Sequence, residues 1–186
     1  FPNKVKEIAE NLPQSIDKNN YKNRLDFTNK LIFTIDGEDT RDIDDAISLE
    51  VNEKGNRVLG VHIADVGEYV KVGSVIDHEA FNRGTSVYFP NSVLPMLPRE
   101  LSNGICSLNE RVDRLALSVL MEMDENANIL SYKIGESIIN SKRRYTYTEV
   151  HKVLMGDKDA VARNSQFVDT LVEMNKLAEQ LGKLRK

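Results

Sequence analysis

Acidic residues are concentrated in one short stretch of the chain. Six of the ten residues from 36 to 45 are acidic, and only Arg41 adds a positive charge there. Like charges this close repel, and burial makes each of them more costly. Unless some are protonated, a divalent cation bound through oxygen ligands is the simplest means of holding them, and such a site points to phosphate chemistry. The acidic residues are Asp36, Glu38, Asp39, Asp42, Asp44 and Asp45.

The spacing allows several of these carboxylates to converge. In extended backbone Asp42 and Asp44 face the same way, whereas Asp45 faces the other way. A turn over residues 37–41 can fold Asp36 back beside them. Four carboxylates would then surround a volume suited to one or two Mg²⁺ ions, which could clamp a scissile phosphate and activate water.

Three other interpretations stay open on spacing alone. A solvated acidic loop is the commonest fate of a charge run. A structural Ca²⁺ loop would have to be irregular, since the sixth position from Asp36 is Arg41 rather than Gly, and the twelfth is Ile47 rather than Glu. A catalytic carboxylate pair of the glycosidase type is the third, although we would not expect such a pair from one ten-residue stretch.

The elements around the acidic stretch must hold it at the edge of a core. Apolar runs lead into it and out of it, and both are typical of buried strands. The whole pattern predicts an α+β (mixed) fold, with a central, mostly antiparallel or mixed sheet flanked by helices. Strands are predicted at 31–36, 45–51, 58–65, 85–89, 115–123 and 129–139, and helices at 4–12, 75–83, 98–103, 148–155 and 165–186.

Local signals refine this outline. Ser74 is a suitable N-cap for the helix at 75–83. Residues 14–29 are expected to be a connecting arm and residues 156–163 a polar loop, while strands 115–123 and 129–139 should form a hairpin. The last helix is amphipathic, with an expected buried face of Phe167, Val168, Leu171, Met174, Ala178 and Leu181.

Bulk composition limits the class of protein. The 186 residues are enough for one domain or part of one, and the net charge of −4 argues mildly against a nucleic-acid partner. No apolar run approaches the roughly 20 residues of a membrane helix, so no membrane association is expected. The single cysteine, Cys106, excludes an internal disulfide and is typical of a cytoplasmic protein. The three histidines are scattered, which argues against a zinc site.

Several long blocks resemble the ribonuclease II / ribonuclease R family of exoribonucleases, specifically its RNB catalytic domain in the bacterial ribonuclease R form. The blocks follow the family's order and cover most of residues 24–155. On this resemblance, residues 1–30 are an N-terminal helix and connecting arm, and residues 31–186 are part of an RNB domain whose later half is missing. The blocks are TIDGEDTRDIDDAISLE, GVHIADVGEYVKVGSVIDHEAFNRGTSVYFPNSVLPMLPRELSNGICSLN, VDRLALSVLMEM and INSKRRYTYTEV.

The resemblance implies a processive 3′→5′ hydrolytic exoribonuclease that depends on Mg²⁺, with Mn²⁺ as the other candidate, and releases nucleoside 5′-monophosphates. Its four catalytic, metal-binding aspartates correspond to Asp36, Asp42, Asp44 and Asp45. Asp36 and Asp45 would contact the principal metal, and Asp44 would be the most sensitive to replacement by Asn. The alternative is a non-catalytic RNA-binding or adaptor member of the family, which the presence of all four aspartates disfavours.

The resemblance also indicates residues that would contact the 3′ end of single-stranded RNA. Tyr88 corresponds to an aromatic side chain that stacks on the terminal base, although a tyrosine beside a proline-rich loop can equally be packed. Asn103 lies in a loop that the family places beside the active centre. Arg111 and Arg114 could line a phosphate track or form part of a solvated face. His62, on an apolar strand, is expected to be structural.

Parts that the family uses are not matched in this sequence. They are a second aromatic clamp and an arginine from the later half of the domain, together with the flanking cold-shock and S1 modules. We therefore expect the chain by itself to be inactive or nearly so, and to belong to a longer active protein.

Overall fold

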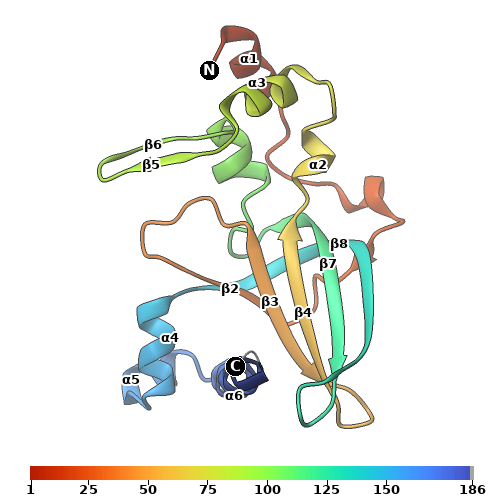
Figure 1. Cartoon of the computed structure of the whole chain (residues 1–186), viewed down its shortest axis with the longest axis vertical. Helices are drawn as coiled ribbons and strands as arrows, with labels where there is room; N and C mark the ends of the chain where they lie inside the picture. Colours follow the sequence, from red (N-terminus) through yellow and green to blue (C-terminus); the bar gives the residue numbers. More distant parts are fainter. Residues whose placement is uncertain (185–186) are drawn as a thin grey trace.

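A mixed six-stranded sheet forms the centre of the molecule in the computed structural model, which describes residues 1–184 (Figure 1). The order of its strands is β1-β8-β2-β3-β4-β7. The predicted α+β fold with a mixed sheet is confirmed. The strands are β1 (Leu25–Asp26), β2 (Ile32–Asp36), β3 (Asp45–Val51), β4 (Arg57–Ala64), β7 (Asp113–Met123) and β8 (Ile129–Thr146).

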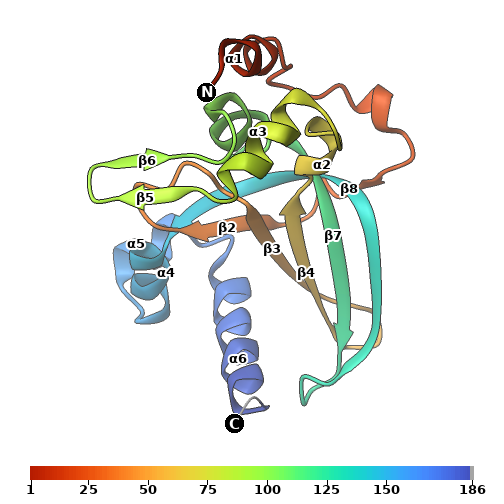
Figure 2. The same ribbon diagram turned by 45° about the horizontal axis from the view of Figure 1, so that its top comes forward.

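The long strand β8 closes this sheet on itself. Residues 129–140 of β8 pair antiparallel with β7, and residues 141–146 pair in parallel with β2. Since β2, β3, β4 and β7 are joined by antiparallel pairs, the pairings form a ring that returns to β8. Figure 2 shows β8 bending from the β7 side of the sheet to the β2 side. This bend brings the end of β8 beside the end of β2, where the acidic stretch begins.

Helices and a small hairpin surround the sheet. Helices α4, α5 and α6 lie against one side of it, and α1, α2 and α3 lie at its other end, beside the projecting hairpin β5–β6 (Figure 1). No helix among residues 1–184 is long and apolar enough to cross a membrane. The helices are α1 (Asn3–Glu10), α2 (Val66–Tyr69), α3 (Val75–Arg83), α4 (Tyr147–Leu154), α5 (Lys158–Arg163) and α6 (Val168–Leu184), with helical turns η1 (Lys18–Tyr21) and η2 (Glu100–Ile105) and hairpin strands β5 (Val87–Phe89) and β6 (Ser92–Leu94).

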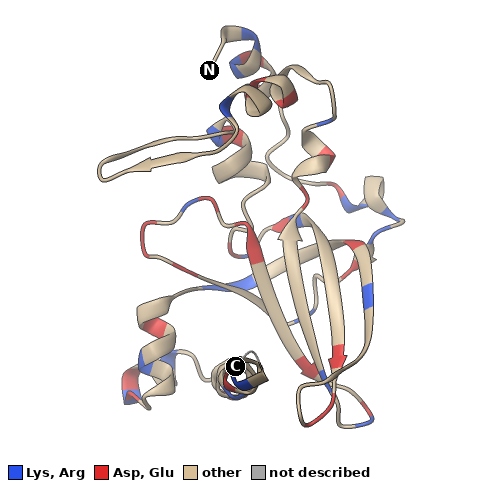
Figure 3. Ribbon diagram, viewed as in Figure 1, with Lys and Arg blue, Asp and Glu red and all other residues tan. Residues whose placement is uncertain are grey.

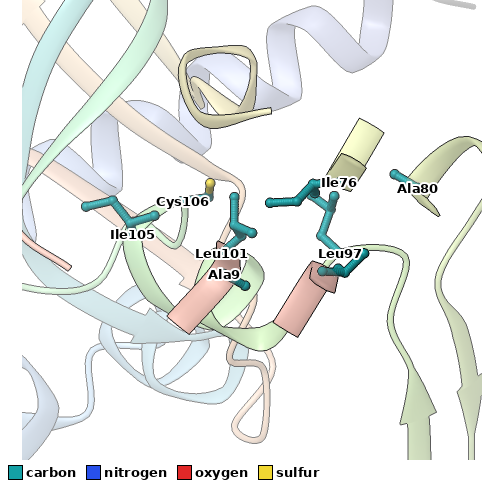
Figure 4. Packing of buried hydrophobic residues seen from close by; sticks show 8 residues of the cluster. Ala9, Ile76, Ala80, Leu97, Leu101, Ile105 and Cys106 are labelled. Atoms are coloured by element: carbon teal, nitrogen blue, oxygen red, sulfur yellow. The ribbon is translucent and has the colours of Figure 1, made fainter. Parts of the chain in front are cut away.

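Two apolar clusters anchor these helices. In one, α1, α3 and η2 pack on each other through buried side chains that include Ala9, Ile76 and Leu101 (Figure 4). In the other, the aromatic rings of Phe33, Tyr145 and Phe167 meet edge to face, with centroids 5.6–5.8 Å apart. The second cluster fastens α4–α6 to β2 and to the end of β8.

Local capping explains several helix boundaries. The Ser74 hydroxyl accepts a hydrogen bond from the backbone N–H of Asp77 (3.1 Å), as expected for the cap of α3. The predicted loop at 156–163 is wrong, because it contains α5. The carboxylate of Asp157 accepts from the backbone N–H of Ala160 (2.9 Å) and starts that helix after Gly156.

Other sequence-based boundaries also needed correction. The arm at 14–29 contains the short strand β1, β8 continues to Thr146, and β6 and α2 were not predicted. Helix α6 begins at Val168 rather than 165, and the predicted extension over 185–186 lies outside the described residues. Ala178 is exposed whereas Leu177 is buried, so the buried face of α6 is rotated relative to the prediction.

His62 lies at the centre of a buried polar chain that crosses four strands. It is completely buried on β4, with Nε2 3.1 Å from the hydroxyl oxygen of Ser48 and Nδ1 2.6 Å from that of Ser118. The Ser118 and Ser137 hydroxyls are 2.6 Å apart. Burial, and then the charge of Lys30, lower the pKa of His62 from 6.5 to about 4. His62 is therefore structural, as expected.

This pKa predicts an acid-sensitive contribution to stability. Because unfolded His62 takes up a proton near pH 6.5 and folded His62 only near pH 4, stability should be lost as the pH falls from 6.5 towards 4, by roughly 3 kcal/mol at most. Urea unfolding at pH 7 and pH 4.5 measures the loss. His62→Gln should reduce this pH dependence, whereas His151→Gln, at an exposed histidine, should not. Equal pH dependence in all three proteins would contradict this role of His62.

Candidate active site

The acidic stretch forms a loop at the edge of the sheet. Asp36 is the last residue of β2, Asp45 is the first of β3, and residues 37–44 connect them without regular structure. Figure 3 shows the loop as alternating acidic segments with one basic interruption, next to the uncharged hairpin β5–β6. The carboxylates thus lie beside a folded core, as the flanking apolar runs predicted.

One anchor of this loop is Ile43, whose side chain is completely buried. Its backbone N–H donates to the hydroxyl of Ser107 (3.1 Å), and its carbonyl accepts from the N–H of Leu108 (2.9 Å). The Ser107 hydroxyl donates in turn to the carbonyl of Arg41 (2.8 Å). The backbone between the aspartates is therefore held against the core, and the buried residue Ile43 is flanked in sequence by Asp42 and Asp44.

Arg144 is the second anchor. One guanidinium nitrogen, Nη2, is within hydrogen-bond distance of three backbone carbonyls of the loop, those of Gly37 (3.3 Å), Glu38 (3.1 Å) and Thr40 (2.5 Å). Arg144 reaches them because β8 lies parallel to β2, with Thr34 opposite Arg144. This contact of Arg144 with the acidic loop was not predicted from the sequence.

The carboxylates influence one another electrostatically. Burial, followed by the charge of Asp45, raises the pKa of Asp36. Burial, followed by the charges of Asp42, Asp45 and Asp36, raises the pKa of Asp44. One oxygen of Asp36, Oδ2, is buried and has no hydrogen-bond partner. Two neighbouring backbone segments therefore bring the four aspartates within electrostatic range, and their negative charge is not fully compensated.

These residues have the ligand chemistry of a magnesium site without forming a closed coordination shell. Carboxylate oxygens are the ligands that Mg²⁺ prefers, and the unsatisfied Asp36 oxygen is a suitable donor. As the side chains stand, no three His, Cys, Asp or Glu residues among residues 1–184 are close enough together to hold a metal ion. Asp42 Oδ2 accepts a hydrogen bond from the Tyr88 hydroxyl (2.7 Å), so this oxygen is already engaged.

A cleft of about 500 Å³ opens between the loop and the β5–β6 hairpin. Tyr88 lines it with a side chain that is 64 % exposed, so this tyrosine is not packed in the core. The hydrogen bond to Asp42 is the main cause that raises the pKa of Tyr88. Asn103 lines the same cleft, and so does Arg99, a cation that sequence reasoning did not select.

Two sequence-predicted RNA contacts lie elsewhere. Arg114 is buried, and its guanidinium donates to backbone carbonyls, including those of Ser107 (2.9 Å) and Gly104 (3.3 Å). It thus supports the segment that carries Ser107 rather than facing the cleft. Arg111 is exposed and does not line the cleft. The four aspartates lie within electrostatic range of one another, and one of them, Asp42, lines the cleft together with Tyr88 and Asn103; these two arginines do not line it.

The structure defines an α+β domain with a cluster of aspartates at the edge of its sheet, and comparison gives the family. Residues 24–186 match the RNB domain family, so the chain belongs to that family. It is 47 % identical over its whole length to ribonuclease R of Thermotoga maritima, of which it spans 26 %. The chain covers about a quarter of the length of the curated relatives that it matches. The resemblance inferred from the sequence is confirmed.

Solved structures show the same relationship. Mycoplasma genitalium RNase R in complex with double-stranded RNA has a TM-score of 0.85 and 32 % identity, covering all of this chain and 33 % of that one. Yeast Ssd1, described as a pseudonuclease, has a TM-score of 0.66 and 25 % identity, covering 79 % of this chain and 18 % of that one. The fold is therefore shared by a protein described as an RNase and one described as a pseudonuclease. Only the residues of the site can distinguish a catalytic from a non-catalytic member.

Charge repulsion in the loop predicts that Asp44→Asn stabilises the protein when no divalent ion is present. The raised pKa means that ionised Asp44 is less favourable in the folded than in the unfolded state, so at pH 7 the neutral amide should raise the melting temperature by about 1–2 °C. The gain should shrink as the pH falls through the raised pKa of folded Asp44 and vanish below pH 3.8, where the carboxyl is protonated in both the folded and the unfolded state. Thermal scans in EDTA across this range measure it, and a lower melting temperature at pH 7 would contradict the repulsion.

The Arg144 anchor predicts a local effect on the loop. Arg144→Met removes every donor that reaches these carbonyls, so the amides of residues 37–44 should exchange hydrogen roughly ten-fold faster while the sheet amides stay protected. The matched control is Arg143→Met, since Arg143 bonds Glu149 on α4 (2.9 Å) instead of the loop. Hydrogen exchange followed by mass spectrometry compares them, and equal exchange in both variants would exclude an anchoring role.

Proposed function

We propose that this chain is the metal-binding part of a Mg²⁺-dependent hydrolytic exoribonuclease that degrades single-stranded RNA processively from the 3′ end to nucleoside 5′-monophosphates in the cytoplasm. One observation carries the proposal. Four aspartates of a single anchored loop lie within electrostatic range of one another, one of them (Asp42) lines the cleft, and one oxygen of Asp36 is buried without a partner.

The residues that would hold the metal are Asp36, Asp42, Asp44 and Asp45. When bound, Mg²⁺ would supply charge neutralisation at the phosphate and activation of water. The chain itself supplies the negative charge that attracts the cation and the rigid backbone that keeps it in one place. Hydrogen bonds of Ile43 and Arg144 hold that backbone.

RNA recognition is assigned to the cleft beside the loop. The exposed ring of Tyr88 offers a face on which a base can stack, and stacking tolerates any base, as a nonspecific nuclease requires. Asn103, which lines the same cleft, is assigned a contact with the sugar–phosphate backbone. The related RNase R structure is described as a complex with RNA, which supports an RNA ligand here.

The catalytic turnover is proposed for a protein that contains this chain together with further parts. The relatives are about four times as long, and we expect the cold-shock and S1 modules and the later half of the RNB domain to contribute to RNA handling. The 186 residues are assigned the metal site and the stacking tyrosine only.

A non-catalytic RNA-binding or adaptor role is the second candidate. The likeness to a protein described as a pseudonuclease favours keeping it, since it shows that the fold alone does not imply cutting. The four aspartates favour the nuclease, because an RNA-holding surface has no need of uncompensated negative charge next to a phosphate backbone.

Metal binding can be tested on the chain itself. Mn²⁺ or Mg²⁺ at 100 times its dissociation constant should raise the melting temperature by about 5 °C or more, because the ion binds only the folded site. Asp36→Asn should abolish the shift by removing the unsatisfied buried oxygen. Glu38→Gln, at an exposed acid of the same loop, should keep it. If the wild-type chain shows no shift, the metal site is refuted.

An experiment on the longer protein can distinguish RNA cleavage from RNA binding. Asp44→Asn should leave binding of a 3′-labelled single-stranded oligoribonucleotide nearly unchanged while lowering its degradation by at least 100-fold. Release of labelled mononucleotide and electrophoretic binding are measured side by side. Unchanged degradation would exclude the proposed catalytic role, and absence of degradation in the wild-type protein would favour the RNA-binding alternative.

A further inference from the structure

A second cavity, which we call the basic pocket, lies at the start of β2, at the opposite end of that strand from Asp36. Its volume is about 830 Å³. Five of its twelve lining residues are cationic, none of them is acidic, and most of the others are amides. The charge of this lining is therefore opposite in sign to the net charge of the whole chain, which is −4. The cationic residues are Lys30, Arg111, Lys142, Arg143 and Arg163.

Carboxylates outside the pocket neutralise three of these cations. Lys30 forms an ion pair with Glu50. Arg111 Nε lies 3.2 Å from a carboxylate oxygen of Glu110. The third pair, between Arg143 and Glu149, is 2.9 Å long. The pocket therefore keeps an excess of two positive charges.

Lys142 and Arg163 provide this excess. The Lys142 ammonium donates to the carbonyl of Thr28 (2.6 Å) and to Asn140 Oδ1 (3.3 Å), both of which are neutral. Arg163, the exposed last residue of α5, forms no ion pair in the part of the chain that the structure describes. Both cations are thus held at the pocket without an anionic partner.

The wall of the pocket also contains an unsatisfied donor. Arg143 Nε is buried and has no hydrogen-bond partner. The amide side chains of Asn29 and Gln166 add further donors to the lining, whereas the amide nitrogen of Asn140 is already bonded to Asp113. Several N–H donors with excess positive charge and no lining acid match a phosphate group, which accepts many hydrogen bonds and is anionic.

The pocket and the acidic loop are separate but connected by one strand pair. The five residues of β2, from Ile32 to Asp36, span roughly 16 Å between them. The consecutive arginines of β8 contact different parts of the chain: Arg143 bonds Glu149 on α4, and Arg144 bonds the acidic loop. Figure 3 shows this basic stretch of β8 beside β2. Binding in the pocket therefore does not use the aspartates.

We propose that the basic pocket is a second, metal-independent site that binds phosphate groups of the RNA backbone. Its volume is much larger than one phosphate group needs, so it suits a run of backbone rather than a single small anion. An acidic protein as a whole repels RNA, and a local excess of cations overcomes this repulsion where the strand must be held. The inference rests on the proposed function, since that function supplies the RNA.

The test uses the 186-residue chain and a labelled single-stranded oligoribonucleotide, in EDTA, at several salt concentrations. Lys142→Gln/Arg163→Gln should weaken binding several-fold and lower the slope of log K against log salt by about 1.4, since each phosphate contact with a single strand contributes about 0.7. The matched control, Lys152→Gln/Lys158→Gln, removes the same charge from exposed sites outside the pocket and should keep the slope.

A single variant guards against a folding artefact. Arg163 makes no ion pair among residues 1–184, so Arg163→Gln should fold normally and still lower the slope by about 0.7. Equal slopes for pocket and control variants would overturn the proposal. Release of the RNA by millimolar inorganic phosphate at constant ionic strength, or equal affinity for polyglutamate, would also overturn it in favour of a small-anion or acidic-peptide site.

The two proposals can fail independently. If the chain shows no metal-induced stabilisation but the pocket variants lose RNA affinity in EDTA, the basic pocket stands and the metal site falls. If Asp36→Asn abolishes the metal response while the pocket variants bind RNA like wild type, the metal site stands and the basic pocket falls.

Discussion

The burial of Ile43 is the constraint on which the candidate site depends. Carboxylates at such density repel one another and would push a free loop into solvent. Burying one isoleucine side chain contributes about 2 kcal/mol, and the hydrogen bonds of Ser107 and Leu108 to the same residue hold the backbone in register. The aspartates therefore keep their positions because Ile43, which lies between Asp42 and Asp44, belongs to the core. Their concentrated negative charge is the feature to which we assign cation binding.

Closure of the sheet by β8 supplies the remaining support. A strand of 18 residues that pairs first with β7 and then in parallel with β2 brings Arg144 to the acidic loop, more than 100 residues away in sequence. The same bend places Arg143 and Lys142 at the basic pocket. One strand thus joins the two features to which we assign metal and phosphate binding.

Much of the fold followed from local sequence signals. The apolar runs around the acidic stretch gave β2 and β3 nearly to the residue, and Ser74 correctly marked the start of α3. Where the local sequence signal was weak or short, the predicted structure was wrong. Residues 156–163 look polar enough for a loop, yet Asp157 caps a helix there. On α6, packing against the sheet buries Leu177 and leaves Ala178 exposed, a rotation that periodicity alone does not fix.

In the candidate site, too, some features followed from local sequence and others only from the tertiary structure. Residue type and spacing determined that the four aspartates lie at the ends of two neighbouring strands and in the loop between them, because this is a property of neighbouring positions on the chain. Only the tertiary structure decided that Arg114 is buried while Arg144 holds the loop, and that Tyr88 is exposed and bonded to Asp42. The partners of a long, charged or aromatic side chain are set by segments that folding brings together, and no local pattern in the sequence encodes them.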